Sequence, residues 1–234
     1  EFLIRDNLKV FQTCKLIQPD LVIEIDYDTD FIQLNDEWKE IHKNVFVKDG
    51  NIVQRYHWKN DEYIYRLEPS GRDTPCRIGV PKDFTKDFCE SGDILNYLAL
   101  DRLMVKYFNC IYFHSSLVLH KNETILFSAP SHGGKSTQAS LWEMWEDAMI
   151  LNGDKSLLKI ESSKLISYGS PIAGTSKIYK NVGAPVKAII FIKKGTENHI
   201  VKLPLKEAYI KLYSEMVKSF WDEEYNKKVL SIVE

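Results

Sequence analysis

A phosphate-binding pattern lies near the middle of the chain. Residues 129–136 read APSHGGKS, which matches the pattern G-x-x-x-x-G-K-[ST] except that Ala129 takes the place of the first glycine. The adjacent glycines let the backbone turn its N–H groups inward, and these groups form a nest for an anion together with the positive end of a helix. Lys135 adds a mobile charge for the β- and γ-phosphate oxygens of a nucleotide, and the Ser136 hydroxyl can ligate Mg²⁺.

The segments on either side supply the strand–loop–helix context that this motif requires. Residues 124–128 form a short apolar run, and a helical pattern extends from Lys135 to about residue 146. The alternative is a Gly-rich turn between a strand and a helix, without a ligand. The residues predicted to bind the nucleotide or its phosphates are Ser131, His132, Gly133, Gly134, Lys135, Ser136 and Thr137.

A histidine lies on the strand that precedes the loop. Residues 111–120 (IYFHSSLVLH) read as one strand, and the polar turn at 121–123 is too short for a helical crossover, so the two strands should be antiparallel neighbours. A two-residue loop at 121–122 pairs His114 with Ala129, and the other loop lengths pair it with one of the next two residues. Every register therefore places His114 beside the start of the phosphate loop, although a structural role is the alternative for a lone histidine.

One carboxylate follows the next strand. Residues 148–151 form a short apolar strand, and the sequence NGDK at 152–155 comes directly after it. An aspartate at this place after a phosphate-loop helix is suited to Mg²⁺, whereas the alternative is a plain β-turn. The predicted metal ligands are Ser136 and Asp154, and the predicted catalytic residues are His114, Lys135 and Asp154.

The elements around these residues predict two regions. Residues 1–90 are β-rich, with strands expected at 21–27, 44–48, 52–58 and 62–67. Residues 91–234 form the nucleotide-binding region, with a helix at 92–108, further strands at 156–160, 165–167 and 188–193, and helices opening at Pro204 and near Trp221.

Aromatic residues are frequent on the predicted strands of the first region: Tyr56, Trp58, Tyr63 and Tyr65. Half-buried faces of an antiparallel sheet are the simpler interpretation, and a surface that recognises a peptide or partner is the alternative.

Composition excludes several classes of protein. The net charge of −2 gives no general attraction to nucleic acid or to a membrane, and no apolar run approaches the roughly 18 residues that span a bilayer. Four scattered cysteines without a C-x-x-C pair argue against a zinc cluster or a disulfide framework. Because the opening segment also lacks the pattern of a secretory signal, the sequence predicts a cytoplasmic protein. The sequence does not decide the oligomeric state, and a homo-oligomer is one alternative.

The ordered set of motifs resembles a known family. The His114 strand, the hairpin, the loop APSHGGKST, the strand ending in NGDK and the segment YGSPIAGTS are similar to the nucleotide core shared by HPr kinase/phosphorylase and phosphoenolpyruvate carboxykinase. The likeness covers about residues 110–200 and is greatest to HPr-kinase-like proteins. It implies an α/β (α+β) P-loop core of mixed sheet with helices. It also implies that ATP phosphates bind the loop, and that Lys135, Ser136 and His114 match the family's lysine, hydroxyl and histidine.

The resemblance leaves one carboxylate for two roles. An Asp-Asp pair in the family corresponds to Gly153-Asp154 here, and its members serve as general base or acid and as a Mg²⁺ ligand. If Asp154 serves the metal, His114 is the first candidate for the base. If Asp154 is the base, Mg²⁺ depends on Ser136 and water.

Three functions follow from these observations. The first is an ATP-dependent kinase, with ATP and Mg²⁺, that transfers the γ-phosphoryl group to a hydroxyl, in the first place a serine, of a small protein or peptide. The second is a nucleotide- or phosphate-binding module of a biosynthetic or regulatory complex, with weakened turnover. The third is an NTPase that drives a conformational change, which the predicted hairpin disfavours because such proteins enter the loop through a crossover. The first 90 residues are a candidate for recognising the acceptor.

Overall fold

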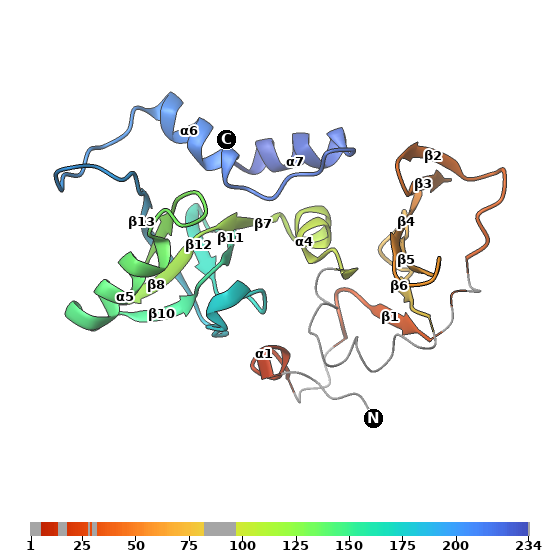
Figure 1. The fold of residues 1–234 in the computed structure, drawn as a ribbon, viewed down its shortest axis with the longest axis horizontal. Coiled ribbons are helices and arrows are strands. Elements are labelled where there is room, and N and C mark those ends of the chain that lie inside the picture. Colours follow the sequence, from red (N-terminus) through yellow and green to blue (C-terminus); the bar gives the residue numbers. More distant parts are fainter. Residues whose placement is uncertain (1–5, 14–17, 28, 30–31, 82–96, 234) are drawn as a thin grey trace. The chain divides into compact units, whose positions relative to one another are not determined.

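The strand, loop and helix predicted around the phosphate-binding pattern are confirmed by a computed structural model, which describes residues 6–13, 18–27, 29, 32–81 and 97–233 (Figure 1). Strand β9 (Glu123–Ser128) ends at the loop, and helix α5 (Lys135–Trp145) begins directly after it. The described residues divide into two compact units, one of residues 13–100 and one of residues 101–233 together with 6–12. None of their helices is long and apolar enough to cross a membrane.

A tight hairpin precedes the loop, as predicted. Strand β8 (Ser116–His120) pairs antiparallel with β9, and His120 lies opposite Glu123. The turn is therefore Lys121-Asn122, with φ of 50° and 64°, the left-handed pair that a two-residue hairpin turn requires. Of the turns that the sequence allowed, the structure has the two-residue loop at 121–122.

The single strand predicted over residues 111–120 is wrong. The chain forms two strands, β7 (Cys110–His114) and β8, and it changes pairing partners at Ser115 between them. Strand β7 pairs with β11 (Lys155–Glu161), and His114 lies opposite Lys155. Both strands are almost wholly buried, and the bend between them falls at the polar residues 114–116, which the prediction had counted as part of one strand.

The second unit is built on a mixed sheet. Its strand order is β10-β8-β9-β13-β12-β11-β7, with β10 (Met149–Asn152), β12 (Lys164–Tyr168) and β13 (Gly183–Phe191). Only β9 and β13 run parallel. The strands predicted at 148–151, 156–160, 165–167 and 188–193 are confirmed, although β13 begins earlier. The chain is therefore a mixed α/β protein, as the predicted fold class requires.

Helices cover both faces of this sheet. Successive residues of β9 alternate between two apolar clusters: Ile125 and Phe127 pack with Ala139 of α5, whereas Leu126 packs with residues of the C-terminal helices. Helix α5 therefore lies on one face. On the other face lie α4 (Leu100–Phe108), α6 (Leu205–Ser214) and α7 (Glu223–Val233).

The helix predicted over residues 92–108 is confirmed only as α4. Ala99 interrupts it with a φ of 46°, and residues 92–96 lie outside the described part of the chain. Helix α4 is fastened to α7 by an ion pair of 2.8 Å between Arg102 Nη1 and Asp222 Oδ2. The guanidinium also stacks on the Trp221 ring, and Asp222 Oδ1 accepts the Tyr225 N–H at 2.8 Å, which caps α7.

We expect Asp222→Ala to destabilise the second unit by about 3 kcal/mol, because it removes a helix cap and leaves a mostly buried guanidinium without its carboxylate. Asp222→Asn retains the cap and should cost less. Urea denaturation of both variants measures the two costs: equal costs would contradict the cap, and an Asp222→Asn variant as stable as the wild type would contradict the ion pair.

The first unit is a six-stranded sheet of order β1-β6-β5-β4-β3-β2. The strands are β1 (Ile23–Asp26), β2 (Lys39–His42), β3 (Val45–Lys48), β4 (Asn51–His57), β5 (Tyr63–Glu68) and β6 (Cys76–Gly79). The four predicted strands correspond to β1, β3, β4 and β5, and only β1 and β6 run parallel. Tyr56 and Trp58 pack against the core of this unit, and the other two predicted aromatic residues are half-buried, as the simpler interpretation expects. Helix α1 (Asp6–Lys9) belongs to the second unit.

Candidate functional site

The loop between β9 and α5 has the backbone of an anion site. Gly134, the residue before α5, has a φ of 101°, and no side chain caps the N–H groups of the first helical turn. At Gly133 a Cβ atom would lie 2.5 Å from the Ala129 Cβ and 2.8 Å from the Pro130 carbonyl oxygen, so no larger residue fits. The methyl group of Ala129, which replaces the pattern's first glycine, therefore packs directly against the loop's second glycine.

The side chains of the loop are open to solvent. Ser131, His132, Ser136 and Thr137 are exposed, and Lys135 is half-buried. Lys135 Nζ donates a hydrogen bond of 2.7 Å to the Ala129 carbonyl oxygen. The lysine thus folds back onto the first residue of the loop, and it must exchange this bond to reach a phosphate oxygen.

Asp154 is held at the bend between β10 and β11 by a buried asparagine. The Asn152 amide oxygen accepts the N–H groups of Asp154 and Lys155 at 2.8 and 2.9 Å. The Asn152 amide nitrogen donates to the carbonyl oxygens of Ser170 and Ile172 at 2.9 and 3.0 Å. Because Asn152 is fully buried, this one side chain fixes both the bend and the loop that follows β12.

That loop packs directly on the bend. A Cβ atom added at Gly153 would lie 2.2 Å from the Ser176 Oγ, and one added at Gly174 would lie 2.9 Å from the Asp154 Cγ. Both contacts come from the short 3₁₀ helix Gly174–Ser176. The space that a second carboxylate at position 153 would need is therefore filled by Ser176.

His114 lies between two carboxylates. Its Nε2 is 3.5 Å from Asp154 Oδ1, and its Nδ1 is 3.5 Å from Glu215 Oε2. The backbone reinforces this arrangement, because the His114 N–H donates to the Glu215 carbonyl oxygen at 2.9 Å. The His114 carbonyl oxygen accepts the Ser128 hydroxyl at 2.9 Å, which ties the histidine to the last residue of the strand before the loop.

The structure brings together three of the predicted site residues. The contact with His114 is the main cause that lowers the pKa of Asp154 below its usual value; partial burial opposes this shift, and the charges of Lys155 and Lys135 add to it. Lys135 therefore lies near enough for its charge to act on the Asp154 carboxylate, whose closest side-chain partner is His114. The remaining predicted residues lie on the exposed loop and the first turn of α5, and no contact joins them to Asp154 within the described residues.

Acid should remove the stability that the Asp154 carboxylate contributes. Since its pKa is lowered on folding, this contribution is present above the unfolded-state value of about 4 and is lost as the pH falls through the folded-state pKa. Urea denaturation should therefore show a difference in unfolding free energy between the wild type and Asp154→Asn that shrinks from about pH 6 to about pH 3. A difference independent of pH would show that Asp154 gains nothing from ionisation.

The donor atoms fit a hard cation only with help from phosphate or water. The Ser136 hydroxyl and the ionised Asp154 are oxygen ligands of the kind that Mg²⁺ prefers. No group of three or more His, Cys, Asp or Glu side chains in the described ranges could hold a metal ion. A cation here would therefore complete its shell with oxygens that the protein does not supply.

Glu215 is the residue of this cluster that the sequence did not reveal. It follows α6, and residues 215–217 extend along β7 through the pairing of Phe113 with Met216 and a bond from the Val217 N–H to the Tyr112 carbonyl oxygen. No motif surrounds it in the sequence. An acidic residue directly after a helix was the one available signal, and it is too common to single out this position.

Comparison with known proteins gives a weak structural likeness. No protein-family model matches the chain, and no curated protein matches it. Among solved structures, the HPr(Ser) kinase/phosphatase from Coxiella burnetii is similar with a TM-score of 0.30 and 18% identity, over 40% of this chain and 66% of that chain. Because a likeness this weak says nothing about the reaction, the functional assignment rests on the residues of the site alone.

Proposed function

We propose that the protein is an ATP-dependent kinase that transfers the γ-phosphoryl group to a hydroxyl of a small protein or peptide, with serine as the expected acceptor. The observation that carries this proposal is the placement of the Asp154 carboxylate 3.5 Å from His114, near enough to Lys135 of the open phosphate loop for the lysine's charge to act on it. A nucleotide-binding loop needs only the lysine, whereas a transfer reaction needs a carboxylate beside it.

The roles follow from the geometry. The orphan amides of the first turn of α5 and the Lys135 ammonium would neutralise the charge that develops on the transferred group. Both ring nitrogens of His114 face carboxylates, so we assign proton acceptance to Asp154 and orientation of Asp154 to His114.

In the transfer step the acceptor oxygen bonds to the γ-phosphorus while the bond to the bridging oxygen of ADP breaks. The acceptor proton passes to the Asp154 carboxylate. When bound, Mg²⁺ would neutralise the charge of phosphate oxygens. The Ser136 hydroxyl and water would be its ligands, and one Asp154 oxygen is a further candidate ligand.

The test uses the full chain, γ-labelled ATP, Mg²⁺ and a cell extract. We expect label on a low-mass acceptor, and we expect Lys135→Ala to abolish it. The matched control is Lys121→Ala, at the exposed hairpin turn. Hydrolysis without transfer, or tight ATP binding with neither, would overturn the kinase assignment.

A binding module with weakened turnover is the second candidate. The observation that favours it is the packing of Ser176 against Gly153, which leaves the bend with a single carboxylate. This function predicts ATP binding that depends on Lys135 and no labelled acceptor under any condition.

A further inference from the structure

The C-terminal end of α5 carries an apolar surface with an acidic rim. Trp145 and Met144 are 75% and 69% exposed, and Leu141 and Met149 of the adjacent strand β10 are also exposed. The exposed residues Glu143, Glu146 and Asp147 neighbour them in the sequence, and the last turn of α5 has no basic residue. We call this group of seven residues the acidic surface. A tryptophan this exposed is unfavourable in water unless something covers it.

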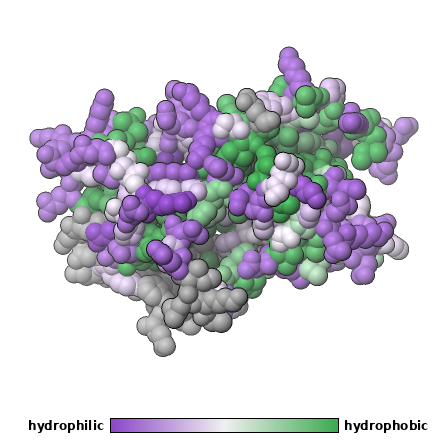
Figure 2. Space-filling model, turned by 180° about the vertical axis from the view of Figure 1, so that it is seen from behind, coloured by the Kyte–Doolittle hydropathy of each residue, from purple (hydrophilic) through white to green (hydrophobic). Residues whose placement is uncertain are grey.

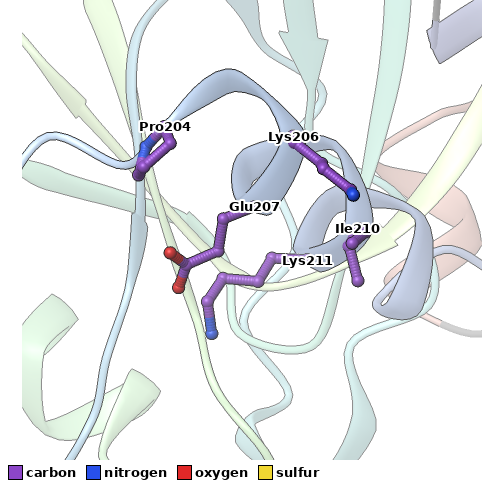
Figure 3. Close-up of a pocket in the computed structure, with 5 residues that line it drawn as sticks. All are labelled: Pro204, Lys206, Glu207, Ile210 and Lys211. Carbon is purple, nitrogen blue, oxygen red and sulfur yellow. The ribbon is translucent and has the colours of Figure 1, made fainter.

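Helix α6 carries an apolar surface with the opposite charge. Pro204, Lys206, Glu207, Ile210 and Lys211 line a depression of about 440 Å³, whose walls are mainly the carbon parts of these side chains (Figure 3). Leu205, which is 87% exposed, and Ile200 and Val201 lie just before it in the chain, together with Lys202. We call these residues the basic surface. Three lysines against one glutamate make it positive.

The two surfaces lie on opposite faces of one sheet. Helix α5 packs on the face of Ile125 and Phe127, whereas α6 packs on the face of Leu126. One molecule can therefore present both surfaces at the same time. Green, hydrophobic side chains reach the molecular surface among purple ones in Figure 2, consistent with apolar area outside the core.

Charge complementarity favours contact between an acidic surface and a basic surface. Two acidic surfaces facing each other would bring six carboxylates together, which is unfavourable, and two basic surfaces would repel in the same way. The acidic surface matches the basic surface in charge, and both have an apolar centre. Among the described residues neither Glu146 nor Lys206 takes part in an ion pair, so both are available.

We propose that the acidic surface of one copy of this chain docks on the basic surface of a second copy, with Trp145 inserted into the depression on α6. Such a contact is head-to-tail, and it closes into a ring or extends as a filament. A central tryptophan in an apolar pocket with a charged rim is the usual composition of an energetic centre of an interface. This inference does not depend on the proposed kinase activity.

The test is sedimentation velocity of the full chain up to about 200 μM, a range that detects weak self-association. We expect the wild type to self-associate, and Trp145→Asp and Ile210→Asp each to weaken association at least tenfold, because each spoils one surface. The decisive sample is a mixture of the two variants. Each supplies one intact surface, so the mixture should form a one-to-one dimer and nothing larger.

Charge exchange provides a second measurement that does not depend on the apolar centre. Glu146→Lys and Lys206→Glu should each weaken association, and a mixture of these two single variants should recover it. Circular dichroism confirms that these exposed substitutions leave the fold intact. A wild type that stays monomeric, or a mixture of Trp145→Asp and Ile210→Asp that stays monomeric, would overturn the proposal. So would self-association unaffected by Ile210→Asp.

Discussion

Asp154→Asn is expected to reduce phosphoryl transfer about 10³-fold, because the amide cannot accept the acceptor's proton. The side chain has nearly the same shape and remains within reach of His114, so the fold should be retained. If proton acceptance is the main role of Asp154, the Kd for ATP with Mg²⁺ should change by less than about threefold. Rates of label transfer and titrations with a fluorescent ATP analogue measure the two effects separately.

The same variant distinguishes the two roles open to this carboxylate. If Asp154 chiefly holds the metal, the Asn variant should bind ATP poorly with Mg²⁺ but normally without it. The matched control is Glu197→Gln, an exposed carboxylate outside the site, which should leave transfer and nucleotide binding unchanged. Transfer within tenfold of the wild type would contradict both roles.

Gly153→Asp is expected to destabilise the second unit by about 3 kcal/mol, because the new Cβ would lie 2.2 Å from the Ser176 Oγ. The cause is steric and not conformational, since the φ of Gly153 is outside the left-handed region. Ser176→Gly should cost about 1 kcal/mol alone, through its bond to the Ala173 carbonyl oxygen. The double variant should cost about 2 kcal/mol instead of the roughly 4 kcal/mol that additive effects would give, a coupling of about 2 kcal/mol.

Urea denaturation of the wild type, both single variants and the double variant measures this coupling. Gly195→Asp is the control, because a Cβ there lies 3.5 Å from its nearest neighbour and should be tolerated. Additive effects at positions 153 and 176 would show that the serine does not fill the space. The double variant also tests whether a second carboxylate at the bend raises transfer.

Local signals predicted the strand–loop–helix motif and the hairpin before it. A short apolar run, two glycines and a polar turn are enough to predict them, because each depends on residues close in sequence. The bend at Ser115 was missed because it depends on which strands pair with β7 and β8, and pairing partners distant in sequence leave no local pattern.

The partners of His114 also could not be predicted in full, because they are distant from it in the sequence. The prediction that it pairs across the hairpin with one of residues 129–131 is wrong, because the hairpin pairing begins at Ser116 and His114 pairs with Lys155. His114 nevertheless lies near the loop, where its carbonyl oxygen accepts the Ser128 hydroxyl. Asp154 could be suspected from its place after a strand, but nothing in the sequence joined it to His114. Glu215 is placed beside His114 by the pairing of residues 215–217 with β7. Ser176 is placed beside Gly153 by a loop that Asn152 anchors. These contacts are tertiary, and only the folded chain reveals them.

The backbone around His114 also provides a built-in spectroscopic reporter. The His114 N–H is bonded to the Glu215 carbonyl oxygen, and the next amide, that of Ser115, is bonded to the Asp154 carbonyl oxygen. Two neighbouring amides are thus bonded to the two segments whose carboxylates lie beside the His114 imidazole: the segment after α6 and the bend between β10 and β11. In hydrogen–deuterium exchange, release of the C-terminal segment would accelerate the first amide alone, and opening of the bend at Asp154 would accelerate the second alone.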